Sequence, residues 1–160
     1  MAQWPLEQNL LDNFTASVAN PSHPDGRSVF VLGHGVWNSF VFKETRQWLH
    51  QVQDALRPSV PSYFATAPSE RFPRLFISPD AQSEAKEELF AQRQNNIALQ
   101  KFVHHLDPFL ASEGYEHLAM YNMTVQDKGM DGTHSSFEAT LLKAMMVLNW
   151  LDALDVPSHA

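Results

Sequence analysis

Apolar residues along the chain alternate between short runs and helical stripes. The first run, Val29-Phe30-Val31-Leu32, ends at Gly33 and is typical of a strand that is buried on both faces of a parallel sheet. A stripe of residues three or four apart follows it, namely Val41, Thr45, Trp48, Leu49, Val52 and Leu56. This spacing predicts a helix over about 40–56 that stops before Pro58.

The same alternation continues through the middle of the chain. The run Arg74-Leu75-Phe76-Ile77, closed by Ser78-Pro79, predicts a second strand, and a long helical stretch begins at Glu84. One apolar stripe marks this stretch: Leu99, Phe102, Val103, Leu106, Phe109 and Leu110. Pro108 is expected to break or kink the helix, and Gly114 is the expected residue just past its end.

A third strand and a third helix complete the pattern. Residues 117–123 are predicted as a strand, and a polar loop over 124–133 follows them. The segment Ser135-Ser136-Phe137-Glu138 has the spacing of a capping box, in which Ser135 and Glu138 exchange hydrogen bonds at a helix start. The helix it opens has a broad apolar face that includes Phe137, Leu141, Leu142, Met145, Val147 and Leu148.

The order of strands and helices predicts an α/β fold, a three-layer sandwich with a mainly parallel sheet. The length of 160 residues suits a single domain over 1–160. In such sheets, sites form beyond the carboxyl ends of the strands. The two segments that follow the first and third predicted strands are therefore the places to look for chemistry.

Composition excludes several kinds of partner and site. Eleven basic against eighteen acidic residues give a net charge of −7, and the chain has no basic block, which argues against nucleic acid and anionic membranes as partners. The absence of cysteine excludes thiolate catalysis and cysteine-based zinc sites. No run approaches the ~20 apolar residues of a membrane-spanning helix, and we expect no signal peptide.

The segment Asp131-Gly132-Thr133-His134 holds the clearest candidate pair. A short turn can aim Asp131 and His134 the same way, so that the carboxylate orients the imidazole as a general base. The positive end of the following helix disfavours imidazolium, while Asp131 favours it. The alternative is an ordinary turn followed by a polar residue before a helix.

The segment Gly33-His34-Gly35-Val36-Trp37-Asn38 follows the first strand. Gly35 and Asn38 could donate hydrogen bonds to an oxyanion, and Trp37 could wall a sugar pocket. The alternatives are a plain connection in which Asn38 or Ser39 caps the helix, and a Trp37 that belongs to the core. His34, Asp131 and His134 form a known metal-ligand set, yet their spacing does not demand a metal, and we expect neither metal nor cofactor.

A serine nucleophile is missing from this picture. Neither G-x-S-x-G nor Gly-Asp-Ser occurs in the sequence. Five serines lie along the relevant part of the chain, none in the turn context of a nucleophile: Ser28, Ser39, Ser62, Ser69 and Ser78.

Taken together, these segments resemble the carboxyl-terminal part of the SGNH hydrolase superfamily, and most of all its PC-esterase branch. Asp131-Gly132-Thr133-His134 is similar to the D-G-x-H block of that branch, and the run from Val31 to Trp37 resembles its strand followed by Gly-His-Trp. Phe76-Ile77-Ser78-Pro79 and the segment Gln94-Asn95-Asn96 keep the order of the family. The resemblance covers about 29–154.

The resemblance implies acyl-ester chemistry on a carbohydrate, by an O-acetyl esterase or acyltransferase. His134 would be the base, Asp131 its orienter, and His34, Gly35, Trp37 and Asn38 the oxyanion or substrate groups. Family members work in the secretory pathway or Golgi lumen, so the same compartment is implied here.

The chain departs from the family pattern because the Gly-Asp-Ser block is absent from the residues before Val29, and G-x-N-D is absent too. We therefore expect an amino-terminally incomplete domain that is inactive alone. The alternative is a catalytically inactive sugar-binding or interaction module of the same fold.

Overall fold

A computed structural model describes residues 12–13, 15–16, 29–58, 60–65, 72–127 and 132–155. Its three strands are β1 (Phe30–Gly33), β2 (Arg74–Ile77) and β3 (Glu116–Leu118). The longer helices are α2 (Phe42–Leu56), α4 (Asn96–Ser112) and α6 (Phe137–Asp155). Shorter turns of helix are η1 (Pro61–Phe64), α3 (Glu88–Ala91) and α5 (Tyr121–Thr124).

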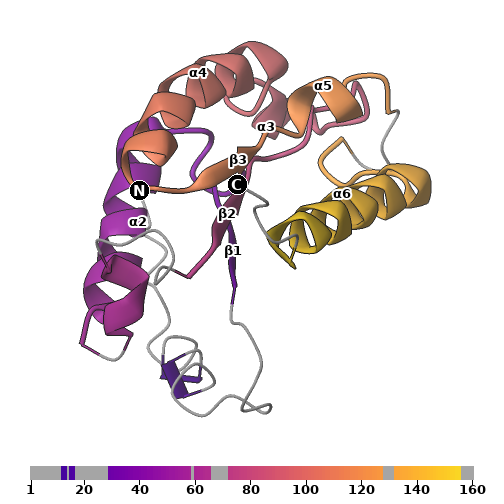
Figure 1. Cartoon of the computed structure of the whole chain (residues 1–160). Helices are drawn as coiled ribbons and strands as arrows, with labels where there is room; N and C mark the ends of the chain where they lie inside the picture. Colours follow the sequence, from indigo (N-terminus) through magenta and orange to yellow (C-terminus); the bar gives the residue numbers. More distant parts are fainter. Residues whose placement is uncertain are drawn as a thin grey trace.

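The strands form one small parallel sheet in the order β1-β2-β3 (Figure 1). Leu32 of β1 lies beside Phe76 of β2, and Phe76 lies beside His117 of β3. The predicted α/β class and the parallel sheet are therefore confirmed for the described residues. Because the strands run in the same direction, the segments that leave β1, β2 and β3 all start at the carboxyl ends of the strands. This end of the sheet is called the carboxyl edge below.

The main core lies between one face of this sheet and the helices α2 and α4. Phe30 and Phe76 supply the sheet side, and they are 1% and 0% exposed. The helices supply the buried residues Leu49, Val52, Leu56, Leu99, Phe102, Leu106 and Leu110. Most of the two predicted stripes is thus buried, which confirms the helical spacing as the signal of the core face.

The end of α4 follows the expected chemistry of a glycine cap. Gly114 has a φ of 76°, its N–H donates to the carbonyl of Ala111, and the N–H of Tyr115 donates to the carbonyl of Leu110. These two bonds are those of a Schellman motif, which favours glycine at the left-handed position.

Two local predictions are wrong, and a third is wrong in part. Pro108 does not break the helix, because α4 continues from Asn96 to Ser112 with Pro108 inside it, while a kink at Pro108 stays a prediction. The third strand ends at Leu118, and Tyr121–Thr124 is a short helix, with Thr124 buried and donating to the carbonyl of Met120. The stretch from Glu84 is not one helix, because α3 ends at Ala91 and Asn95 then caps α4 through its side chain.

The start of α6 also differs from the expected capping box. The Ser136 hydroxyl accepts from the amide of Ala139 at 3.2 Å, so the cap falls one residue later than predicted. Ser135 is instead engaged with Asp80. In Figure 1, α6 lies on the other side of the strands from α2, and its Trp150 donates to Glu116 of β3 at 2.9 Å.

Much of the apolar surface of α6 faces solvent. Its exposed apolar residues, between 45% and 75% exposed, are Phe137, Leu141, Leu142, Met145 and Leu148. Among the described residues, no helix has the length and apolar character needed to cross a membrane.

Candidate functional site

The carboxyl edge of the sheet holds most of the residues that the sequence singles out. The segment after β1 is tightly turned, since Phe40 N–H donates to the carbonyl of Gly35 and Ser39 N–H to that of Val36. Ser39 and Phe40 have φ values of 56° and 60°, in a region that costs energy for any residue with a side chain. Burial of the Phe40 ring, which is 6% exposed, helps to offset this cost.

Gly35 allows this turn to pack closely against the rest of the edge. Its φ is 136°, and a Cβ there would come within 3.0 Å of Phe102 and Pro79. The Gln94 side chain also donates to the carbonyl of Val36 at 2.9 Å. The turn after β1 is therefore held against the start of the segment after β2.

Within the turn, His34 and Asn38 share the hydroxyl of Thr45, a fully buried residue of α2. His34 Nδ1 lies 2.9 Å from Thr45 Oγ1, and the Asn38 amide nitrogen donates to the same oxygen at 3.0 Å. The His34 ring stacks on Trp48 at 4.6 Å between centroids. Burial lowers the pKa of His34 because desolvation penalises the charged imidazolium.

The Asn38 side chain is committed to the turn itself. Its amide nitrogen also donates to the carbonyl of Val41 at 3.2 Å, and its Oδ1 is buried without a hydrogen-bond partner in the described part of the chain. To stabilise an oxyanion, Asn38 would have to give up one of these bonds. Trp37, by contrast, is 74% exposed and is not a core residue.

The Asp131–His134 pair is only half visible, since Asp131 lies outside the described residues. His134 is exposed. Gly132 is buried with a φ of 81°, and its carbonyl accepts from Ser83 N–H. The Thr133 hydroxyl accepts from Lys86 at 2.6 Å. These bonds hold the segment after Asp131 against the loop that follows β2. The distance between the side chains of Asp131 and His134 stays a prediction.

Sequence reasoning missed a polar cluster at this place: Asp80, Ser135 and Lys143. The Ser135 hydroxyl donates to Asp80, and Lys143 Nζ lies 2.6 Å from Asp80 Oδ2 and 3.0 Å from Ser135 Oγ. Two signals could have pointed to it. Lys143 is a lone cation in an apolar helix, two turns after Ser135, and Asp80 follows the Ser78-Pro79 that closes the second strand.

This cluster can donate hydrogen bonds and can supply the positive charge of Lys143. Because Lys143 pairs with Asp80, its ammonium acts as a positive hydrogen-bond donor at the edge of the sheet. The Ser135 hydroxyl has a carboxylate as its acceptor in place of an imidazole. The cluster therefore joins α6 to the loop after β2.

The structure brings two of the predicted segments to one neighbourhood. The turn after β1 contacts Pro79, and the segment of His134 contacts Asp80 through Ser135. In the described ranges, no group of three or more His, Asp or Glu side chains is placed to hold a metal ion.

Comparisons with protein-family models, with curated proteins and with solved structures find no match to this chain.

Proposed function

We propose that the carboxyl edge of the sheet is a binding site for an acylated carbohydrate, in a domain akin to the PC-esterase branch of the SGNH hydrolases. The fold in this proposal is a three-layer sandwich. The observation that supports it is the parallel sheet, which starts the turn after β1 and the loop after β2 from one edge, where the Gly132–Ser135 segment also packs.

Each candidate residue then has a role in this proposal. His134 is the base, since its ring is exposed at the edge, and Asp131 orients it. The exposed indole of Trp37 offers a flat apolar surface to a sugar ring. The Gly35 amide is the oxyanion donor, while His34 and Asn38 fix the turn through Thr45.

Turnover would need a nucleophile, and the sequence holds neither Gly-Asp-Ser nor G-x-S-x-G. Ser78 is 2% exposed and donates to the Leu118 carbonyl, and Ser135 donates to Asp80. Ser39 is the remaining candidate beside the Gly35 turn. We therefore expect binding of the acyl ester without serine-dependent turnover by the 160-residue chain.

A second candidate is a sugar-binding module with no catalytic role. The bonds that tie the Asn38 amide to Thr45 and Val41 favour it, because they take that donor away from an oxyanion.

The experiment is an NMR titration of the chain with methyl 6-O-acetyl-glucoside, using methyl glucoside as the matched ligand. We expect saturable shifts at the Gly132 and Gly35 amides with the ester, and at least tenfold weaker binding after Trp37→Ala. Equal shifts with both sugars would favour the plain sugar-binding module. No saturable shift with either sugar would contradict both candidates.

A fluorophosphonate probe tests the catalytic part separately. We expect no labelling of the chain above that of His134→Ala. Stoichiometric labelling at one serine, with Ser39 the first to map, would show that the chain has its own nucleophile.

A further inference from the structure

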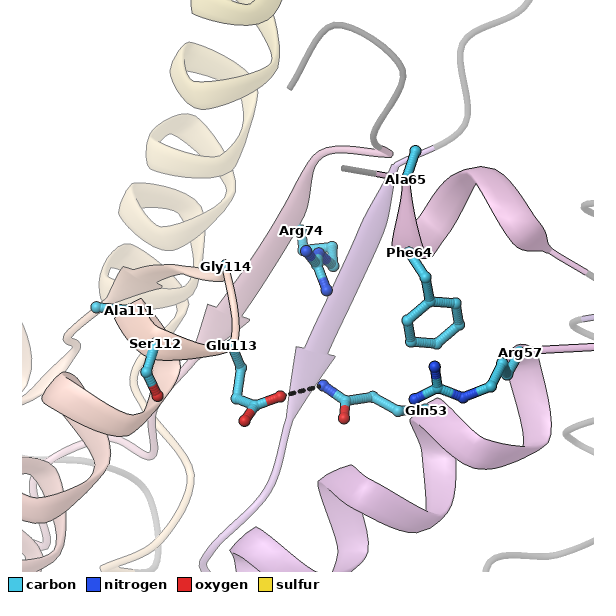
Figure 2. A pocket seen from close by; sticks show the side chains of 9 residues that line it. All are labelled: Gln53, Arg57, Phe64, Ala65, Arg74, Ala111, Ser112, Glu113 and Gly114. Atoms are coloured by element: carbon cyan, nitrogen blue, oxygen red, sulfur yellow. Dashed lines mark hydrogen bonds between the residues drawn. The ribbon is translucent and has the colours of Figure 1, made fainter. Parts of the chain in front are cut away.

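A pocket of about 290 Å³ lies at the opposite end of the sheet from the candidate site (Figure 2). Its walls come from the ends of α2 and α4, from Phe64, and from Arg74, the first residue of β2. Gly114, which also lines it, precedes β3. The pocket is therefore at the amino ends of the strands.

Arg74 is the distinctive residue of this pocket. It is 8% exposed, and its guanidinium carbon lies 4.6 Å from the ring centroid of Tyr63 and 5.2 Å from that of Tyr115. It belongs to none of the ion pairs formed within the described ranges. The Nε of Arg74 is buried, and it has no hydrogen-bond partner within the described ranges. Aromatic faces offset only part of the cost of burying such a charge.

The opposite wall of the pocket is negative. Glu113 lies there, with Oε2 accepting from Gln53 at 3.0 Å and Oε1 3.9 Å from His50 Nε2. Helices α2 and α4 both end at this place, and a helix carboxyl end carries about half a negative charge. Figure 2 shows Arg74, Glu113 and Gln53 around the same pocket, with Glu113 and Gln53 joined by their hydrogen bond.

A second arginine, Arg57, sits at the mouth. Its side chain is 62% exposed, 4.0 Å from Asp54, and its guanidinium carbon lies 4.4 Å from the Phe64 centroid. Its charge is therefore shared with solvent and with Asp54. Arg74 is left as the buried cation of the pocket, and Phe64 as its apolar wall.

We propose that this pocket binds a small zwitterion, whose carboxylate pairs with Arg74 and whose ammonium faces Glu113 and the end of α4. A guanidinium fork matches a carboxylate in shape and charge. A purely anionic ligand, and a phosphate dianion above all, would be repelled by Glu113 and by the two helix ends. The volume is at the small end of the roughly 300–1,000 Å³ of small-molecule pockets, which suits a ligand of amino-acid size.

The test compares three ligands that differ only in their charged groups. L-Leucine carries both, 4-methylpentanoate lacks the ammonium, and 3-methylbutylamine lacks the carboxylate. Each is titrated to millimolar concentrations into the whole chain, and the Gln53 side-chain amide and the Gly114 backbone amide are followed by NMR. We expect saturable shifts with leucine and about tenfold or weaker binding of either analogue, because each loses one charge-assisted contact.

Matched variants assign the two charges. Glu113→Gln should weaken leucine binding and leave 4-methylpentanoate unaffected or tighter, whereas Glu138→Gln on α6 should change neither. Arg74→Met should abolish binding. Lys101→Met is its control, because it loses the same charge at an exposed site.

If Arg74→Met does not fold, the comparison of the three ligands on the unmodified chain still tests the proposal. Absence of a saturable shift with leucine, or equal binding of all three ligands, would overturn the proposal. Neither result bears on the acyl-ester site at the other edge.

Discussion

Lys143 Nζ lies 2.6 Å from Asp80 Oδ2, and this ion pair joins α6 to the loop after β2 across 63 positions of sequence. Both side chains are largely shielded, at 24% and 13% exposed. The Ser135 hydroxyl donates to the same carboxylate oxygen. Because α6 exposes much of its apolar surface, this polar cluster is a principal attachment of the helix to the sheet edge.

Breaking this pair should therefore loosen α6. Lys143→Met leaves the Asp80 carboxylate without its cation, and we expect a loss of about 1–3 kcal/mol in the free energy of unfolding. Urea titration followed by circular dichroism measures it. Lys101→Met, at an exposed position of α4, should change stability by no more than ~0.5 kcal/mol. If the two variants were equally stable, the pair would contribute nothing to holding α6.

The conformation of Gly132 gives a prediction about the candidate site. Its φ is 81°, and a Cβ there would lie 2.1 Å from the Lys86 amide nitrogen. Gly132→Ala should therefore push the Thr133–Ser135 segment away from the loop after β2, at a cost of about 1–3 kcal/mol. The Lys86 and Ser83 amide signals should move in NMR spectra.

The matched variant is Gly33→Ala. A Cβ at Gly33 would meet the Ile77 carbonyl oxygen at 3.2 Å, a milder contact that small shifts can relieve. A Gly132→Ala protein as stable as the parent, with unchanged Lys86 signals, would show that residues 132–135 are not packed as described.

The parallel sheet and its core faces followed from the sequence because they depend on periodicity and on burial. The β1 and β2 runs are short and apolar, and the α4 stripe from Leu99 to Leu110 has the 3.6-residue repeat of a helix with one buried face. The glycine cap at Gly114 followed for a similar local reason, since a left-handed residue there needs no long-range information.

The local predictions that failed concern residues whose contact partners lie far away in the sequence. The segment after β3 turns into a helix where Thr124 is buried and accepts from the amide of Ala81, a contact that no local pattern encodes. The predicted capping role of Ser135 was displaced by Asp80, 55 positions away. Arg74 does begin the second strand as predicted, but its buried stacking on Tyr63 and Tyr115 could not be seen in the sequence.

His34 predicts a pH dependence at the turn after β1. Burial lowers its pKa below 6.5 in the folded chain, so between the two pKa values the unfolded chain binds more protons. Stability should therefore rise with pH in that range and fall as pH drops below about 6.5. The His34 ring protons should titrate with a midpoint below 6.5 in NMR, and His34→Asn should flatten the stability profile in this window. A normal midpoint for His34 would contradict its burial against Trp48.

Tyr63 and Tyr115 predict the opposite behaviour at high pH. Their hydroxyls are hydrogen-bonded to each other, and they are 0% and 5% exposed. Burial raises the pKa of both above the ordinary 10.0, because a phenolate loses its hydration there. The folded chain then holds more protons than the unfolded chain above pH 10, so stability should fall as pH rises through this range.

A titration to high pH measures this effect through phenolate absorbance and far-ultraviolet circular dichroism. Of the three tyrosines in the chain, these two should ionise only when the chain unfolds and its circular dichroism is lost. Tyr63→Phe, which keeps the ring beneath Arg74, should leave one such delayed ionisation. Phenolate absorbance that reaches its full value while the circular dichroism is still native would show that both hydroxyls are open to solvent.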